Sequence, residues 1–171
     1  MKGEQVPTQR SVRVELYLLR HAHAGDPAAW RGPDEDRPLS VKGRKQSKRL
    51  GTFLADGGFR PDAILSSPKL RAVQTAKVVA RELRAKVHTN ARLASDVSLE
   101  MLERVLDEAP GAQRVVVVGH DPDFSDLLSL LSGTVLELAK GALARIDIDR
   151  PLRPGRGELR WLVPPDALRT R

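Results

Sequence analysis

The sequence contains no cysteine, and this absence excludes several kinds of chemistry. Without thiolates the protein has no disulfides, no cysteine-ligated zinc or iron–sulfur site and no cysteine nucleophile. Catalysis must therefore rest on histidine, aspartate, glutamate, serine, threonine, lysine, arginine or tyrosine. Four histidines are present.

Aromatic residues and long apolar runs are also scarce. Three Phe, two Trp and one Tyr leave few platforms for base stacking, which argues against a single-strand nucleic-acid binder. No apolar run approaches the ~20 residues of a transmembrane helix. Residues 1–11 lack the apolar core of a secretory signal, so we expect a cytoplasmic protein with a flexible N-terminal segment over residues 1–11.

The length of 171 residues suits one domain, which we place over residues 12–171. The 29 Lys and Arg residues exceed the 22 Asp and Glu residues by seven. Such an excess can indicate nucleic-acid binding, but we interpret the run from Lys42 to Arg49 as the solvated face of a helix. We expect no nucleic-acid partner. No heptad repeat is visible, and we expect a monomer.

Hydrophobic periodicity predicts strands that alternate with helices. Strands are expected over residues 12–19, 63–65, 115–118, 143–149 and 159–163, with a weaker one near residue 87. Helices are expected after Ser40, after Ser67, over residues 98–106 and after Asp121. This alternation is typical of a three-layer α/β/α sandwich with a mainly parallel central sheet.

Two helix starts carry specific signals. Ser40 is predicted to cap a helix that ends at Gly57-Gly58, with an inner stripe formed by Gly43, Leu50, Phe53 and Leu54. Ser67 is predicted to cap the next helix, with Pro68 at its first position. The apolar stripe of that helix comprises Ala72, Ala76, Val79 and Leu83.

Polar residues follow three of the predicted buried strands. Arg20 and His21 end the first, Arg71 lies shortly after the second, and His120 follows the strand over residues 115–118. In open α/β sheets, ligands bind beyond the carboxyl ends of the strands. We therefore expect these two arginines and two histidines to form one site.

These residue types suit phosphoryl transfer. Arginine forks bind phosphate oxygens, and a neutral imidazole can attack phosphorus and hold the phosphoryl group covalently. Nearby guanidinium charges disfavour the cationic form of such a histidine. The arginines and His120 would stabilise charge on the phosphoryl oxygens. This scheme requires no metal and no cofactor.

Several segments resemble motifs of the histidine phosphatase superfamily, which has the phosphoglycerate-mutase-like fold. They are LYLLRHAHA, DRPLSVKGRKQ, SSPKLRAVQTA, VVVVGHDP and the closing ELRWLVP, which together span roughly residues 14–165. The likeness is greatest to the small SixA-type phosphohistidine phosphatases of this superfamily. The resemblance implies that His21 becomes phosphorylated and that Arg20, Arg71 and His120 complete a phosphate-binding pocket.

The general acid is less clearly marked. Asp121 follows His120 as the acid does in one branch of the superfamily, but it could equally cap the helix that follows. Asp96 lies in a loop where other branches supply an acid, and it could also be a surface or capping residue. A weakly marked acid favours phosphohistidine or another activated phosphate. The P–N bond of phosphohistidine breaks more easily than the P–O bond of a phosphomonoester when its imidazole leaves protonated.

Other functions stay open at this point. A small phosphorylated molecule could be the substrate instead of a phosphorylated protein, and the pocket could bind phosphate without turnover. His21 and His23, together with His120 and Asp121, could also ligate a metal in a hydrolase. The two arginines would repel such a cation, so we expect no metal here.

Overall fold

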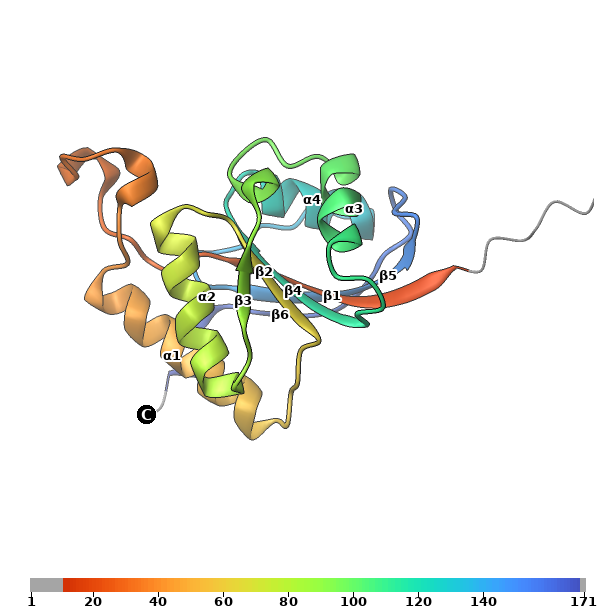
Figure 1. Ribbon diagram of the computed structural model, residues 1–171, viewed down its shortest axis with the longest axis horizontal. Helices are drawn as coiled ribbons and strands as arrows, with labels where there is room; N and C mark the ends of the chain where they lie inside the picture. The colour runs from red at the N-terminus through yellow and green to blue at the C-terminus, as the bar shows by residue number, and fades with distance from the viewer. Residues whose placement is uncertain (1–10, 170–171) are drawn as a thin grey trace, which may run out of the picture.

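The computed structural model describes residues 11–169, in which six strands form one sheet (Figure 1). The strands are β1 (Val12–Arg20), β2 (Ala63–Ser66), β3 (Val87–Thr89), β4 (Arg114–Gly119), β5 (Leu143–Arg150) and β6 (Glu158–Val163). Their order across the sheet is β3-β2-β4-β1-β5-β6. β1, β2, β3 and β4 are parallel to one another, and β5 alone runs in the opposite direction, antiparallel to both β1 and β6, which confirms the predicted mainly parallel sheet. The predicted flexible segment, residues 1–11, lies outside the described residues except for Ser11.

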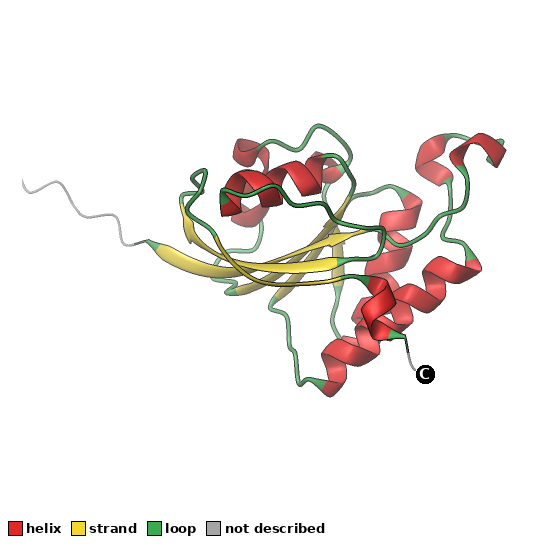
Figure 2. Ribbon diagram, turned by 180° about the vertical axis from the view of Figure 1, so that it is seen from behind, coloured by secondary structure: helices red, strands yellow, loops and turns green. Residues whose placement is uncertain are grey.

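Helices cover both faces of the sheet, as predicted (Figures 1 and 2). The helices α1 (Val41–Asp56) and α2 (Leu70–Leu83) pack on one face, and α3 (Leu99–Asp107) and α4 (Asp123–Ser132) pack on the other. Each face has its own apolar core, and β4 contributes alternate valines to both. None of the helices within residues 11–169 is long and apolar enough to cross a membrane.

The start of α1 follows the predicted signal. The hydroxyl of Ser40 accepts a hydrogen bond from the backbone N–H of Gly43 at 3.1 Å and so caps the helix. Gly43 is required for close packing, because a Cβ at this position would overlap the carbonyl oxygen of His23 just beyond β1. The predicted stripe of α2 is also confirmed, since all four of its residues are buried.

Two local predictions are wrong. Phe53 was expected on the inner side of α1, but 47% of its surface is exposed, because it lies one turn beyond Arg49 on the outer side while Leu50 and Leu54 point inward. Ser67 does not cap α2, which begins at Leu70 after Lys69. The Ser67 hydroxyl instead bonds a histidine ring, as described below.

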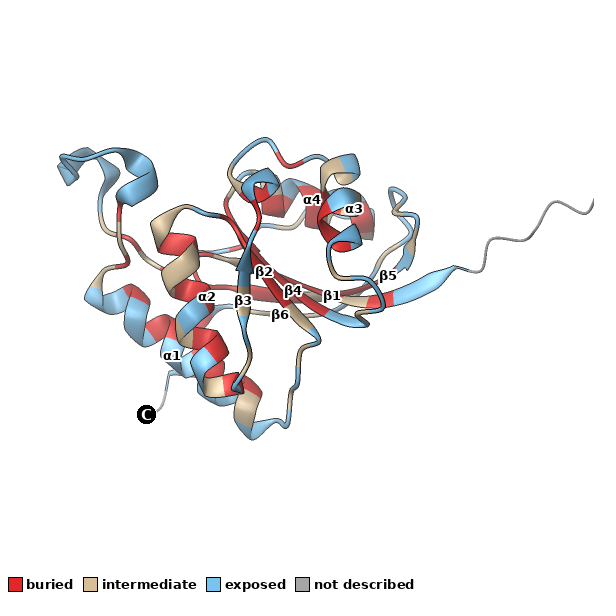
Figure 3. Ribbon diagram, viewed as in Figure 1, coloured by how far each residue is buried: buried red, intermediate tan, exposed pale blue. Residues whose placement is uncertain are grey.

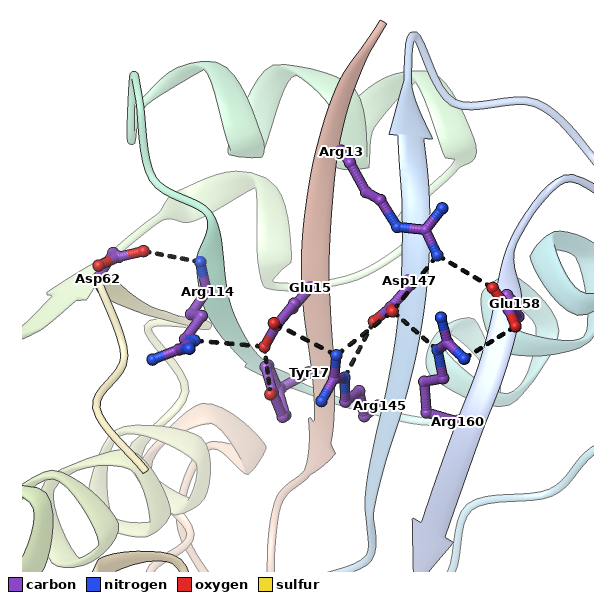
Figure 4. A network of polar contacts seen from close by, with 9 residues as sticks. All are labelled: Arg13, Glu15, Tyr17, Asp62, Arg114, Arg145, Asp147, Glu158 and Arg160. Atoms are coloured by element: carbon purple, nitrogen blue, oxygen red, sulfur yellow. Dashed lines mark hydrogen bonds and ion pairs between the residues drawn. The ribbon is translucent and has the colours of Figure 1, made fainter. Parts of the chain in front are cut away.

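Helices leave part of one sheet face uncovered, and a network of ion pairs occupies it (Figure 4). The carboxylate of Asp147 on β5, only 5% exposed, accepts hydrogen bonds from Arg145 at 3.0 Å and Arg160 at 2.8 Å. Burial alone would raise the pKa of Asp147, but these two arginines outweigh burial and lower it. Arg13 and Arg160 also pair with Glu158, at 3.0 and 2.9 Å. Charges on this face are therefore neutralised within the fold.

Candidate active site

Three parallel strands end side by side at the carboxyl edge of the sheet. In the register of β1 and β4, Arg20 lies opposite Gly119. The next residue on β1, His21, donates its backbone N–H to Gly119 at 2.9 Å, and Ser67 after β2 donates to Val118 at 2.9 Å. His120 directly follows Gly119. Sheet hydrogen bonds thus bring together residues that are 46 to 99 positions apart, since 67 − 21 = 46 and 120 − 21 = 99.

His21 is held as a neutral ring with one nitrogen free. Its Nδ1 lies 2.8 Å from the carbonyl oxygen of Ala22, and a carbonyl can only accept, so Nδ1 carries the proton. The lone pair therefore resides on Nε2. Burial is the largest of the effects that lower the pKa of His21 to about 4; the charges of Arg71 and Arg20 act in the same direction, and the Ala22 carbonyl opposes them. At neutral pH this ring is a nucleophile that needs no deprotonation.

His120 lies beside it, with ring centroids 5.2 Å apart. Its Nε2 is 2.7 Å from the hydroxyl of Ser67, which in turn accepts the backbone N–H of Lys69 at 3.2 Å. The Ser67 hydroxyl can therefore donate its proton to Nε2 of His120. In this arrangement Nε2 is the acceptor, so the ring proton lies on Nδ1, which becomes a buried donor. Burial first, and then the positive charges around it, lower the pKa of His120 to about 3.

Arg71 is buried, Arg20 is partly buried, and both are only partly bonded. Arg20 donates from Nη1 to the Leu138 carbonyl at 2.7 Å and lies 3.1 Å from an Asp121 carboxylate oxygen. Arg71 donates from Nη1 to the backbone carbonyl of Asp34 at 2.7 Å and from Nη2 to its carboxylate at 2.9 Å. The Nε atoms of both arginines have no partner within residues 11–169.

Unpartnered buried atoms gather at this edge. Among the described residues, four buried side-chain nitrogens lack a hydrogen-bond partner, and they belong to Arg20, Arg71, His120 and Asn90. A buried donor without a partner costs about 1–3 kcal/mol, so native proteins rarely keep one without a function. A tetrahedral anion bound at this edge would offer acceptor oxygens to three of these nitrogens, those of Arg20, Arg71 and His120.

Sequence reasoning missed Asp34 and Asn90. The carboxylate of Asp34 joins Arg71 to Arg37, whose Nε lies 3.1 Å away, and so ties the segment between β1 and α1 to the site. Burial alone would raise the pKa of Asp34, but the two arginines together lower it. Asn90 directly follows β3, at the same edge of the sheet. A polar residue after a predicted strand was a signal that could have identified Asn90.

The two candidate acids occupy different surroundings. Asp121 contacts Arg20 and accepts the Ser125 hydroxyl at 2.7 Å and the Ser125 backbone N–H at 3.2 Å. It thus supports the start of α4 from a position before the helix. Asp96 is exposed, with a left-handed φ of 56°. Its neighbour Val97 donates a backbone hydrogen bond to Asp123 at 3.1 Å, which keeps Asp96 close to the start of α4.

His23 has a partner of its own. Its Nδ1 lies 2.7 Å from the Ser40 hydroxyl, and its backbone carbonyl accepts the Ser40 N–H at 3.0 Å. These bonds join β1 to the start of α1. Within residues 11–169 no group of three or more histidine, aspartate or glutamate side chains is arranged to hold a metal ion.

Comparisons with known proteins agree with this geometry. The model of the histidine phosphatase superfamily (branch 1) matches residues 16–96. An uncharacterized protein of Picosynechococcus is 40% identical over 118 residues, which cover 66% of this chain and 70% of that protein. Phosphohistidine phosphatase SixA of Escherichia coli is 27% identical over 164 residues, covering 91% of this chain and 97% of that protein.

A comparison with solved structures agrees with these sequence comparisons. The structure of a protein histidine phosphatase SixA complexed with tungstate superposes with a TM-score of 0.79 at 23% identity, covering 91% of this chain and 100% of that one. The phosphoglycerate-mutase-like fold predicted from the sequence is therefore confirmed.

Proposed function

Since this chain belongs to the histidine phosphatase superfamily and is a phosphatase, we propose that it hydrolyses protein phosphohistidine through a covalent intermediate on His21. One observation carries the proposal: the free lone pair of His21 lies among the unpartnered buried donors of Arg20, Arg71 and His120. Such donors suit the oxygens of a phosphoryl group.

In the first step, Nε2 of His21 attacks phosphorus. The new P–Nε2 bond forms while the bond between phosphorus and the substrate imidazole breaks. The substrate ring leaves as neutral imidazole when its second nitrogen already carries a proton. The His21 ring then bears positive charge, which the Ala22 carbonyl stabilises through the Nδ1–H hydrogen bond.

In the second step, water attacks the phosphorylated His21. The new P–O bond forms as the P–Nε2 bond breaks, and dihydrogen phosphate and neutral His21 result. Arg20, Arg71 and the Nδ1–H of His120 hold the three phosphoryl oxygens through both steps. No step passes through a metal ion.

The state of the acidic residues supports phosphohistidine as the substrate. A phosphomonoester leaves as a poor alkoxide, and a proton donor typically speeds that step by ~10²–10⁴-fold. The carboxylate of Asp121 is held by Arg20 and Ser125, and Asp96 is exposed. Neither is poised as the dedicated donor that an alkoxide needs. A partly protonated substrate imidazole needs none, and the similarity to SixA points the same way.

The decisive experiment is to trap the intermediate. The purified protein is mixed with a protein phosphorylated on histidine with ³²P, quenched in base and denatured. We expect an acid-labile, base-stable phosphoryl group on the wild-type chain and none on His21→Ala. His88→Ala, which changes an exposed histidine on β3, is the matched control and should label normally. Undiminished turnover by His21→Ala would refute the mechanism.

The substrate class is tested separately. Turnover is compared for phosphohistidine protein, sugar phosphates and nucleoside monophosphates. We expect the phosphohistidine protein to have the highest kcat/KM. Efficient turnover of sugar phosphates alone would instead indicate a small-molecule phosphatase, and phosphate binding without any turnover would indicate a binding module.

We further propose that residues 12–171 form one domain that works in the cytoplasm as a monomer. The exposed large apolar side chains are spread over several elements rather than gathered in one wide patch. Cell fractionation and sedimentation velocity test these two expectations. A stable dimer at micromolar concentration would contradict the second.

A further inference from the structure

The outer side of α1 is exposed (pale blue in Figure 3), and its sequence is strongly basic. We define its basic face by five exposed cations: Lys42, Arg44, Lys45, Lys48 and Arg49. At about 100° per residue these positions cover roughly 160° of the helix circumference. No acidic residue precedes Asp56 in the helix. None of the five side chains forms an ion pair or hydrogen bond with another residue in the described range.

This arrangement costs helix stability. Lys45 faces Lys48 three positions on and Arg49 four positions on, and like charges at these spacings destabilise a helix. Several arginines elsewhere in the chain are paired with carboxylates within the fold, as around Asp147 (Figure 4). The basic face of α1 is therefore a surface whose counter-charges lie outside the described fold.

An apolar groove adjoins the basic face. It has a volume of about 550 Å³ and lies between α1 and the 3₁₀ turn Pro165–Leu168. Phe53, 47% exposed, lines it together with Ala167 and Leu168. Its lining also includes the cations Lys45, Lys48 and Arg49, and one carboxylate, that of Asp56 at the end of α1. Val41, 71% exposed, extends the apolar surface towards the start of the helix. Cations thus border a place for apolar side chains.

The basic face begins beside the candidate active site. Ser40, which caps α1, bonds His23 two residues beyond His21. From Val41 to Phe53 the helix extends about 18 Å, at 1.5 Å per residue. A small phosphorylated molecule held at His21 cannot span this distance, whereas a protein bound there can cover it.

We propose that the basic face and the groove beside Phe53 dock an acidic, amphipathic segment of the phosphorylated protein substrate. Its carboxylates pair with the cations, and its apolar side chains enter the groove. The groove favours protein over nucleic acid, because a sugar–phosphate backbone has no aliphatic side chains to bury there. This inference rests on the proposed function for the identity of the substrate, but not for the chemistry of the docked segment.

The first test reverses charge on this face. The variant Lys45→Glu/Lys48→Glu/Arg49→Glu is compared with Lys77→Glu/Arg81→Glu/Lys86→Glu, which makes the same charge change at exposed positions on and just after α2. At low salt we expect the first variant to lose about 10–100-fold in kcat/KM for a phosphohistidine protein, mainly through KM. The control should stay within about threefold, and both variants should hydrolyse phosphoimidazole as the wild type does.

The groove is tested by Phe53→Asp against Phe53→Leu. We expect Phe53→Asp to raise KM for the phosphoprotein several-fold and Phe53→Leu to leave it almost unchanged, with equal thermal midpoints for the two. Unchanged kcat/KM for the phosphoprotein in both the triple α1 variant and Phe53→Asp would overturn the proposal.

A binding experiment separates this proposal from the proposed function. The ¹⁵N-labelled wild-type protein is titrated with a helical peptide of about 16 residues built from Glu and Leu, with the same peptide carrying Gln in place of Glu, and with a DNA duplex. We expect the acidic peptide alone to shift the amide signals of α1 and of Leu168. A duplex that binds this face more tightly than the peptide would assign the face to nucleic acid. If the wild type failed to hydrolyse any phosphohistidine protein, the proposed function would fall, and peptide binding would still decide the docking surface.

Discussion

Two arginine-bearing regions of the same sheet differ in how their nitrogens are used. At the carboxyl edge, Arg20 and Arg71 each keep a buried Nε without a partner among the described residues. On the uncovered face, Arg145 and Arg160 direct their Nε atoms to the carboxylate of Asp147 (Figure 4). Both regions hold arginines paired with carboxylates, but only the first also keeps buried guanidinium nitrogens that no acceptor among the described residues reaches.

The difference separates a structural use of charge from a binding use. A saturated network stabilises the fold and leaves nothing for a ligand, because each donor already has an acceptor. A buried donor that stays unpartnered costs stability, and this cost is recovered when a ligand supplies the acceptor. The two regions should therefore respond in opposite ways to mutation and to pH.

The largest contrast is expected from arginine removal. Arg71→Ala should lower kcat/KM for phosphohistidine protein by about 10²–10³-fold, because one phosphoryl-binding fork is lost. Arg160→Ala should leave kcat/KM within twofold, since its partners Asp147 and Glu158 lie on the uncovered face. Steady-state kinetics measure both. Equal losses in the two variants would remove the distinction between the regions.

As the pH falls, the histidines at the carboxyl edge of the sheet should lose their contribution to stability before the ion pairs around Asp147 lose theirs. The pKa values of His21 and His120, about 4 and about 3, lie below the 6.5 of the unfolded chain. The unfolded chain therefore binds protons first, so this stabilisation is complete above about pH 6.5 and is lost as pH falls towards 4. We expect a loss of about 2 kcal/mol per histidine between pH 8 and pH 5.

Urea unfolding of the wild type and of His21→Gln at both pH values measures this effect. The variant should lose about half of the pH dependence. The pKa of Asp147 is also lowered, but from an ordinary value of 3.8, so its contribution persists at pH 5 and is lost only as pH falls below 3.8. Titration of the His21 or the His120 ring near pH 6.5 in NMR spectra would contradict the neutral state assigned to these two rings.

Breaking the network should affect stability without affecting activity. Asp147→Asn leaves Arg145 and Arg160 with a weaker acceptor, and we expect the free energy of unfolding to fall by about 1–3 kcal/mol. Turnover of phosphohistidine protein at 25 °C should stay within twofold of the wild type. Chemical denaturation and kinetics on the same preparation provide the comparison, and a large loss of kcat with unchanged stability would contradict it.

The smallest effect is expected at Ser67. Ser67→Ala removes the partner of His120 Nε2, so the ring loses its fixed orientation but keeps its place after β4. We expect kcat to fall about tenfold with little change in KM, and Ser67→Thr to recover most of the loss because it restores the hydroxyl. A matching fall in thermal stability would show that Ser67 acts on the fold instead of on His120.

Much of the fold could be predicted because its signals are local. Ser40 precedes a period-3.6 pattern, and the run of valines over residues 115–118 is apolar enough to indicate a central strand. The gathering of Arg20, His21, Arg71 and His120 follows from the rule that parallel strands end at one edge. Their catalytic roles stay a prediction until the intermediate is trapped.

The misses have a common physical origin. Ser67 has two competing partners, the N–H groups of a helix start and the ring of His120, and only the folded chain decides between them. Phe53 lies at the border between the two sides of α1, where periodicity is least informative. Asp34 lies in the segment between β1 and α1, which has no strand or α-helix, and it meets Arg71 37 residues further along the chain, so no local pattern marks the contact.

Gly43 limits how freely the protein can be re-engineered. The cations of α1 and the pocket around His21 are separate enough that changes in one should leave the other intact. At Gly43 that independence ends, because any side chain there would push α1 away from the carbonyl of His23. A library that diversifies the helix to redirect partner choice should therefore vary the exposed positions and hold this glycine constant.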